Sequence, residues 1–168
     1  MTNILDRIIA NKKTEVEKHK AAMPIDRLEK QLAFVAKKES FKTALQNSDT
    51  GIIAEFKRRS PSRDWIFKDA RVQDVIPAYS QNGASAISVL TDMDFFGGNL
   101  DDLKMARSLT TTPLLRKDFM IDEYQLYQAA WLGASAILLI ASALTNDKTR
   151  QLAKKAKDLD LDVLLEIH

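Results

Sequence analysis

Short apolar runs alternate with helical patterns along most of this 168-residue chain, and this alternation constrains its fold more than any other feature. Five runs rich in Ile, Leu and Val are typical of buried strands, at 51–57, 84–91, 112–117, 134–140 and 161–168. Helical patterns lie between them, at 72–81, 101–108, 122–132 and 147–159. Because strands that alternate with helices form parallel sheets, we predict an α/β fold.

The first 48 residues show a different pattern, which predicts a helical extension outside the repeat. Apolar residues recur at helical spacing after Asn3, a candidate N-cap, and Pro24 is placed to open a second helix that reaches Val35. We therefore divide the chain into a helical extension at 1–48 and a β/α repeat at 49–168.

An internal repeat supports the predicted alternation of strands and helices. Gly83-Ala-Ser-Ala-Ile recurs as Gly133-Ala-Ser-Ala-Ile, two strand–helix units later. A glycine directly after a helix takes the left-handed conformation that ends the helix, so we expect this at Gly83 and Gly133. The repeat length is compatible with a β/α barrel and also with an open doubly wound sheet.

The composition limits the partners and the chemistry that are possible for this chain. With 25 Lys and Arg against 23 Asp and Glu, the net charge of +2 argues against nucleic acid as a partner. The sequence has no cysteine, which rules out thiolate chemistry and permits a reducing cytoplasm. Asp6 and Arg7 would interrupt the apolar core of a signal peptide, and no long uncharged apolar run follows. We therefore expect no membrane segment.

Four charged residues end otherwise apolar strands: Glu55 and Lys57 on the first, Lys117 on the third and Glu166 on the fifth. Residues two apart on a strand share a face, so all four side chains can meet in one cavity if that face is inward. Such residues are individually often solvated or in structural ion pairs. Their coincidence on alternate strands favours an acid/base site.

Other motifs are weaker. Ser60-Pro-Ser-Arg is most simply a turn, and Phe95-Phe-Gly-Gly a loop with an aromatic wall. No glycine-rich nucleotide fingerprint occurs. Because His19 and His168 lie far apart and no cysteine accompanies them, we expect no metal.

Several segments together resemble indole-3-glycerol-phosphate synthase in order and spacing: Ile53-Ala-Glu-Phe-Lys-Arg-Arg-Ser-Pro-Ser, Ser88-Val-Leu-Thr-Asp, Phe96-Gly-Gly, Leu115-Arg-Lys-Asp-Phe, Asp122-Glu-Tyr-Gln and Leu165-Glu-Ile-His. The resemblance covers the whole chain. It implies a TIM-type (β/α) barrel, here incomplete with about five β/α units after the helical extension. It also implies conversion of 1-(2-carboxyphenylamino)-1-deoxyribulose 5-phosphate to indole-3-glycerol phosphate, with loss of carbon dioxide and water, in tryptophan biosynthesis and without a cofactor.

The same resemblance implies roles for individual residues. Lys117 is similar to the family's general acid and Glu166 to its general base, while Lys57 contacts anionic groups of the substrate with support from Glu55. The substrate-binding residues by resemblance are Ser60, for the carboxylate, and Phe96 and Phe119, for the aromatic ring.

Two departures from the family pattern bear on these expectations. Arg63-Asp64-Trp65 stands where the family usually has a glycine-bearing turn. The sequence also ends at the fifth strand, whereas barrels of this type have eight and commonly hold phosphate after strands seven and eight. We therefore expect the chain to hold most of the acid/base groups but to bind substrate weakly.

Two hypotheses remain beside the lyase. In the first, the chain is a non-catalytic half-barrel that self-associates through open sheet edges. A different phosphosugar barrel, such as phosphoribosylanthranilate isomerase, fits the fold equally but the quoted motifs poorly.

Overall fold

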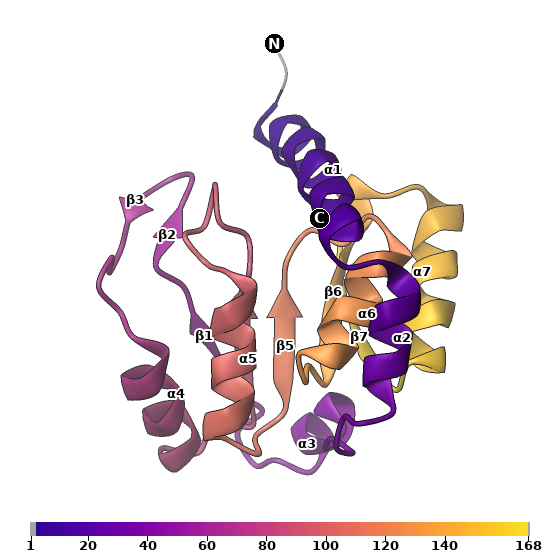
Figure 1. Ribbon diagram of the computed structural model, residues 1–168. Helices are drawn as coiled ribbons and strands as arrows, with labels where there is room; N and C mark the ends of the chain where they lie inside the picture. Colours follow the sequence, from indigo (N-terminus) through magenta and orange to yellow (C-terminus); the bar gives the residue numbers. More distant parts are fainter. Residues whose placement is uncertain (1–2, 168) are drawn as a thin grey trace.

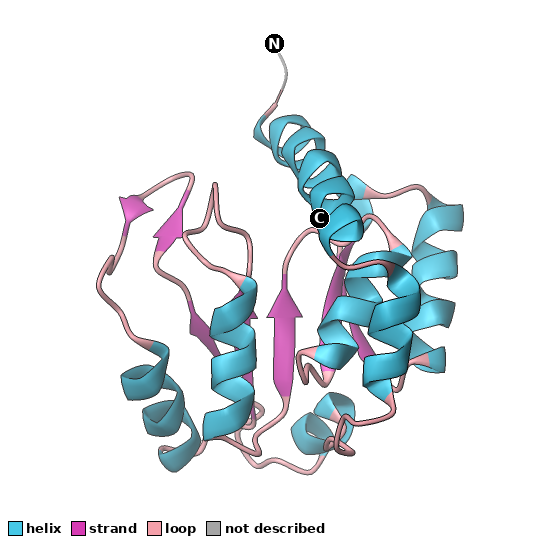
Figure 2. Ribbon diagram, viewed as in Figure 1, coloured by secondary structure: helices cyan, strands magenta, loops and turns pink. Residues whose placement is uncertain are grey.

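The computed structural model describes residues 3–167, so Met1, Thr2 and His168 lie outside it. Its centre is a five-stranded sheet with helices packed along it (Figures 1 and 2). The strands are β1 (Ile53–Phe56), β4 (Ala86–Leu90), β5 (Leu114–Lys117), β6 (Ala136–Ile140) and β7 (Asp162–Glu166). A short hairpin, β2 (Arg59–Ser60) and β3 (Asp64–Trp65), follows β1.

The helices after β1 fall within two residues of the predicted ranges. They are α4 (Val72–Gln81), α5 (Leu100–Leu109), α6 (Glu123–Trp131) and α7 (Asn146–Asp158), with a 3-10 turn, η1 (Ala141–Ala143), after β6. Side-chain caps start most of them. The carboxylate of Asp122 accepts from the Tyr124 amide, and Gln125 completes a capping box at the start of α6.

The strand order distinguishes the barrel from the doubly wound sheet. The order is β1-β4-β5-β6-β7, every pair is parallel, and spatial order therefore follows sequence order. A doubly wound sheet would reverse direction at a switch point and carry helices on both faces. Here α4 to α7 share one apolar layer with one face of the sheet. The arrangement is that of an incomplete β/α barrel, as predicted.

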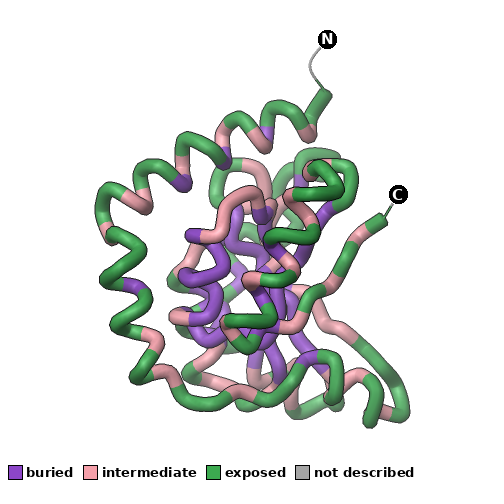
Figure 3. Tube along the Cα trace, turned by 90° about the vertical axis from the view of Figure 1, so that its right-hand side faces the viewer, coloured by how far each residue is buried: buried purple, intermediate pink, exposed green. Residues whose placement is uncertain are grey.

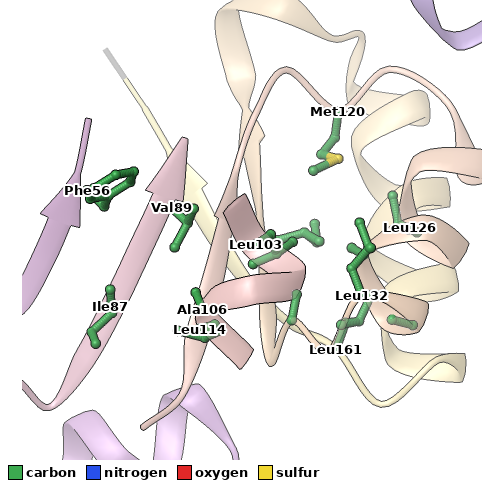
Figure 4. Packing of buried hydrophobic residues seen from close by; sticks show 14 of the residues in the cluster. Phe56, Ile87, Val89, Leu103, Ala106, Leu114, Met120, Leu126, Leu132 and Leu161 are labelled. Carbon is green, nitrogen blue, oxygen red and sulfur yellow. The ribbon is translucent and has the colours of Figure 1, made fainter. Parts of the chain in front are cut away.

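The outer layer between sheet and helices holds most of the core. Phe56, Ile87 and Val89 of the strands belong to one buried cluster with Leu103, Leu126 and Leu132 of the helices and the turn after α6 (Figure 4). Leu103 is fully buried, and shortening such a side chain to alanine typically costs about 2–5 kcal/mol. Burial along β7 alternates instead, with Val163, Leu165 and Ile167 exposed near the C-terminus (Figure 3).

The inner face of the sheet is covered at the amino ends of the strands by α3 (Phe41–Gln46), which the sequence patterns did not predict. Phe41 of α3 is buried against Ala86, Leu115 and Ala136, three inward-facing strand residues. Six residues are too few for a helical period to stand out in the sequence. This helix closes one end of the half-barrel and leaves the carboxyl ends of the strands for the site.

The N-terminal region is helical, as expected. The helix α1 (Ile4–Ala22) is capped by Asn3, whose side-chain oxygen accepts from the Asp6 amide at 2.8 Å. The helix α2 (Ile25–Leu32) follows Pro24 but ends before Val35, so the expected extent of this helix was wrong. Bonds from Phe34 and Val35 to carbonyls three residues earlier tighten its last turn. The division at residue 48 stays a prediction.

Both repeat glycines take the expected left-handed conformation, with φ of +83° at Gly83 and +86° at Gly133. Their surroundings differ. A Cβ on Gly83 would have nothing within 4 Å, whereas one on Gly133 would clash with the side chain of Arg107.

We therefore expect Gly133→Ala to destabilise the protein more than Gly83→Ala. The left-handed backbone alone should cost about 1–2 kcal/mol at each position. The displaced Arg107 should add to the loss at Gly133. Urea denaturation measures the free energy of unfolding of both variants. Equal losses of stability would show that the Arg107 side chain moves aside without destabilising the protein.

Candidate active site

The carboxyl ends of the strands bring three of the charged strand-end residues into direct contact. Lys117 Nζ lies 2.5 Å from Oε2 of Glu55, and Lys57 Nζ lies 2.7 Å from Oε1 of the same carboxylate. All three side chains are between a quarter and about a third exposed. Glu55 thus bridges two ammonium groups, one from its own strand and one from β5.

The electrostatics of Glu55 follow from these contacts. Burial by itself would raise the pKa of Glu55, but the hydrogen bonds and charges of Lys117 and Lys57 outweigh burial and lower it below its ordinary value. The carboxylate is therefore ionised over the neutral pH range and fixes the position of both ammonium groups.

Glu166 joins these residues around one hollow of about 370 Å³ at the carboxyl ends of the strands. It ends β7 and is half-buried, on the same side of that strand as Leu164. The wall also includes residues of α1, of strands β4 and β6, and of the segments after β1, β4, β5 and β6: Ile4, Leu5, Ile8, Pro61, Leu90, Phe96, Asp118, Phe119, Leu138, Ile140 and Ser142.

Two aromatic rings line the hollow together. Phe96, in the loop after β4, and Phe119, after β5, have ring centroids 5.9 Å apart with planes tilted by 40°. This geometry is in the favourable range for aromatic pairs. The hollow therefore combines an apolar wall that can accept an aryl group with two ammonium and three carboxylate side chains.

Ser60 is the one predicted site residue that does not line the hollow. It lies in β2 with its side chain buried, 3.4 Å from the hydroxyl of Ser62, and its neighbour Pro61 forms the wall instead. The predicted turn is present between β2 and β3.

The residues that depart from the family pattern form this hairpin. Asp64 takes φ of +51°, a left-handed conformation that aspartate tolerates better than most residues. Its carboxylate also accepts from Arg59 Nε at 2.8 Å. Trp65 packs beside Gly97 of the loop after β4 and stacks with Arg59, which gives it a structural role.

A buried ionic network lies beside the site and ties α1 to it. Lys12 is fully buried, with Nζ 2.9 Å from carboxylate oxygens of both Asp92 and Asp118 and 2.8 Å from Glu15. Arg116, also fully buried, contacts Asp118 at 3.0 Å. The network holds the loops after β4 and β5 against one helix.

The two aspartates also shape the loops that carry the aromatic rings. Asp92 accepts from the Phe95 amide, and Asp118 accepts from the Phe119 amide, each at 2.8 Å. Burial alone would raise the pKa of Asp118, but the charges of Lys12 and Arg116 lower it far below its usual range. Burial would likewise lower the pKa of Lys12, but Asp118 and Asp92 raise it well above its usual range.

The sequence patterns did not reveal this network, although one signal was available. Ile8, Lys12 and Val16 follow one another at intervals of four, so Lys12 interrupts a stripe that is otherwise buried and apolar. A lysine on such a stripe needs buried carboxylate partners. Their positions, directly after two strand ends, could be recognised only once the strands were placed side by side.

The described residues, 3–167, contain no group of three or more His, Cys, Asp or Glu side chains arranged to hold a metal ion. Within the same range no helix has the length and apolar character needed to cross a membrane.

Comparison with known proteins identifies the family of this chain. The family model described as indole-3-glycerol phosphate synthase matches residues 5–168. The chain belongs to the indole-3-glycerol phosphate synthase family. Proteins named indole-3-glycerol phosphate synthase from Bacteroides thetaiotaomicron and Legionella pneumophila (strain Paris) are 54% identical over 168 residues and 43% identical over 169 residues. One from Alkaliphilus metalliredigens is 44% identical over 166 residues.

The first two of these alignments cover 100% of this chain, and the third covers 98%. The chain spans about 65% of the length of these synthases. Membership of the synthase family covers the helical extension and all five strands of the half-barrel.

Loss of the Lys12 charge should destabilise this family member strongly. Lys12→Met leaves Asp92 and Asp118 buried without their ammonium partner, and such changes typically cost about 3–5 kcal/mol. Lys13→Met, at an exposed position on the same helix, is the matched control and should change stability by less than about 0.5 kcal/mol. Urea denaturation measures both values. Similar losses in the two variants would mean that the network contributes little.

Asp118 should also make the protein sensitive to acid. Its pKa is lower in the folded than in the unfolded state, so its contribution is complete above the unfolded value of about 3.9 and is lost as the pH falls further. We expect Asp118→Asn to reduce the slope of unfolding free energy against pH by up to about 1.4 kcal/mol per pH unit below pH 4. Parallel curves for variant and wild type, from urea unfolding between pH 2.5 and 7, would contradict the assignment.

Proposed function

We propose that this chain carries the acid/base groups of an indole-3-glycerol-phosphate synthase. The reaction closes the indole ring of 1-(2-carboxyphenylamino)-1-deoxyribulose 5-phosphate to give indole-3-glycerol phosphate, carbon dioxide and water. The observation that carries the proposal is the shared hollow, in which Lys117 and Glu166 lie with an aromatic wall. A small phosphosugar substrate is expected from the family, and we place the reaction in the cytoplasm, in tryptophan biosynthesis.

Each step of the reaction needs a group that the hollow supplies. Lys117 protonates the substrate carbonyl oxygen as the aryl carbon attacks the carbonyl carbon and the carboxylate leaves as carbon dioxide. Glu166 then removes a proton from the new ring, while the hydroxyl group takes up a second proton, supplied by Lys57, and departs as water. Cations next to oxygen stabilise the charge that develops in the first step, and a dry apolar wall strengthens that interaction.

The remaining residues position the substrate. Glu55 holds the Nζ atoms of Lys57 and Lys117 at 2.7 and 2.5 Å, so the two cations present a fixed pair to the anionic groups of the substrate. Phe96 and Phe119 bind the aryl ring between the loops after β4 and β5. Ser60 would reach the substrate carboxylate only after a shift of the β2–β3 hairpin toward the hollow.

Lys117→Ala and Glu166→Gln should each lower kcat by about 100-fold or more, which is the usual contribution of a general acid or base. The measurement is the fluorescence of the indole product, with this chain and with a version extended to the length of the relatives. Lys154→Ala, on the exposed side of α7, is the control and should keep the wild-type rate. Unchanged turnover in the extended Lys117→Ala variant would rule out the acid assignment.

The alternative is a non-catalytic half-barrel that self-associates, and a specific observation favours it. The outer strands β1 and β7 each pair on one side only, and Val163, Leu165 and Ile167 along the β7 edge are 37%, 48% and 74% exposed. Exposed apolar edge strands favour pairing with another chain.

Light scattering across a concentration series tests this alternative. The proposal predicts a mass above that of one chain, 18.9 kDa, at high concentration, and Leu165→Lys should shift the mass toward the monomer. A stable monomer at every concentration would exclude self-association, whatever the turnover of the extended protein.

A further inference from the structure

A second cavity, of about 690 Å³, lies at the opposite ends of the strands from the hollow. Its lining comes from α5, from the carboxyl ends of α5 and α6 and the residues after them, and from the segment 34–39 that follows α2. Four cationic side chains line this cavity against a single carboxylate, that of Glu39: Lys37, Lys38, Lys104 and Arg107. None of these residues takes part in the proposed reaction.

The two half-buried cations of this basic cavity, Lys38 and Arg107, have no direct ion pair in the described part of the chain, and the only carboxylates that act on them, those of Asp160 and Glu39, do so from a longer range. No carboxylate among residues 3–167 lies within 4.0 Å of the charged nitrogens of Lys38 or Arg107. Their hydrogen bonds go to backbone carbonyls instead, from Lys38 Nζ to Ala130 at 3.4 Å and from Arg107 Nη2 to Thr110 and Thr112. Burial accordingly lowers the pKa of both side chains below their ordinary values.

Helix dipoles explain only part of this charge. A cation at the carboxyl end of a helix is favourable, which accounts for Arg107 beside α5 and Lys38 beside α6. It does not account for Lys37 and Lys104, or for a cavity at that place. An excess of positive charge around a cavity attracts anions, and a half-buried cation that has no direct ion pair interacts with an anion more strongly than an exposed one.

The apolar part of the wall includes two aromatic side chains. Trp131 has Lys104 Nζ 5.7 Å from its ring centroid, and Phe34 is 84% exposed. Hydroxyl groups of Ser108, Thr110 and Thr111 complete the rim. The volume is in the range of small-molecule sites, about 300–1,000 Å³.

We propose that the basic cavity binds a small organic anion that has an aromatic ring and at least two negative charges. Its charged groups contact Lys38 and Arg107, and its ring lies against Trp131. The cavity is separate from the hollow with Lys117 and Glu166, so this binding does not depend on the proposed function.

Fluorescence of Trp131 provides the test. In the Trp65→Phe variant Trp131 is the only tryptophan, and benzene-1,3,5-tricarboxylate serves as the probe. We expect a saturable change in emission and shifts in the amide NMR signals of Thr111 and Gly133. Raising NaCl from 50 to 500 mM should weaken binding several-fold through screening. The absence of any response up to 10 mM probe would overturn the proposal.

Variants locate the site. Lys38→Gln and Arg107→Gln should each weaken the probe at least fivefold, whereas Lys154→Gln, on the exposed side of α7, should leave it unchanged. Because Arg107→Gln also removes hydrogen bonds, Lys104→Gln is a second variant that loses only a ring contact. Thermal unfolding followed by circular dichroism establishes that each variant is folded. If Lys117→Gln weakened the probe and the basic-cavity variants did not, the anion would bind in the hollow and the proposal would be wrong.

Two further probes test the chemical class. The neutral benzene-1,3,5-tricarboxamide should not bind, because it lacks the charges that the cations select. Inorganic phosphate should bind more weakly than the tricarboxylate, because it lacks the ring. Equal affinity for either compound would contradict the stated ligand class.

Discussion

The contact of one carboxylate, Glu55, with the ammonium groups of Lys57 and Lys117 is the constraint on which the site depends. Glu55 and Lys117 lie on β1 and β5, which are separated by β4. Strands two apart in a flat sheet are about 10 Å from each other. Their side chains meet because the sheet curves, with α3 and the site on its inner side and α4 to α7 on its outer side. The ion pair and the curvature therefore support each other.

The second constraint is the network centred on Lys12. Parallel strands end in independent loops, and nothing in the sheet itself fixes where Phe96 and Phe119 lie. Asp92 and Asp118 bond the amides of those loops, and Lys12 neutralises both carboxylates from α1. The helical extension thus contributes to the geometry of the site as well as to its wall, through Ile4, Leu5 and Ile8. These contacts join the helical extension to the half-barrel, although its sequence pattern is distinct from that of the repeat.

Much of the fold could be predicted because its signals are local. Apolar runs gave the five strands, helical spacing gave α4 to α7, and Gly83 and Gly133 marked the ends of helices. The family membership was predicted from motifs in the correct order. The choice of a barrel over a doubly wound sheet could not come from the residues alone, because both folds share unit length and differ in strand order.

The features that were missed depend on contacts between distant segments. The short helix α3 is stabilised by its position under the sheet, and the β2–β3 hairpin by Asp64 and Trp65 against neighbouring loops. The shared face of Glu55 and Lys57 could be predicted, because residues two apart on a strand point to the same side, and both line the hollow with Lys117 and Glu166. The position of Ser60 could not be predicted in this way, because it depends on the β2–β3 hairpin, in which Ser60 is buried outside the lining of the hollow.

The most direct test of the bridged carboxylate is the pKa of Glu55, followed through its side-chain carboxyl carbon by NMR between pH 2.5 and 7. The two lysines should hold this pKa below that of an unperturbed glutamate, about 4.3, and Lys117→Met should raise it. A pKa at or above the unperturbed value, unmoved by the Lys117 substitution, would mean that the strand-end charges do not meet and that the site described above does not form.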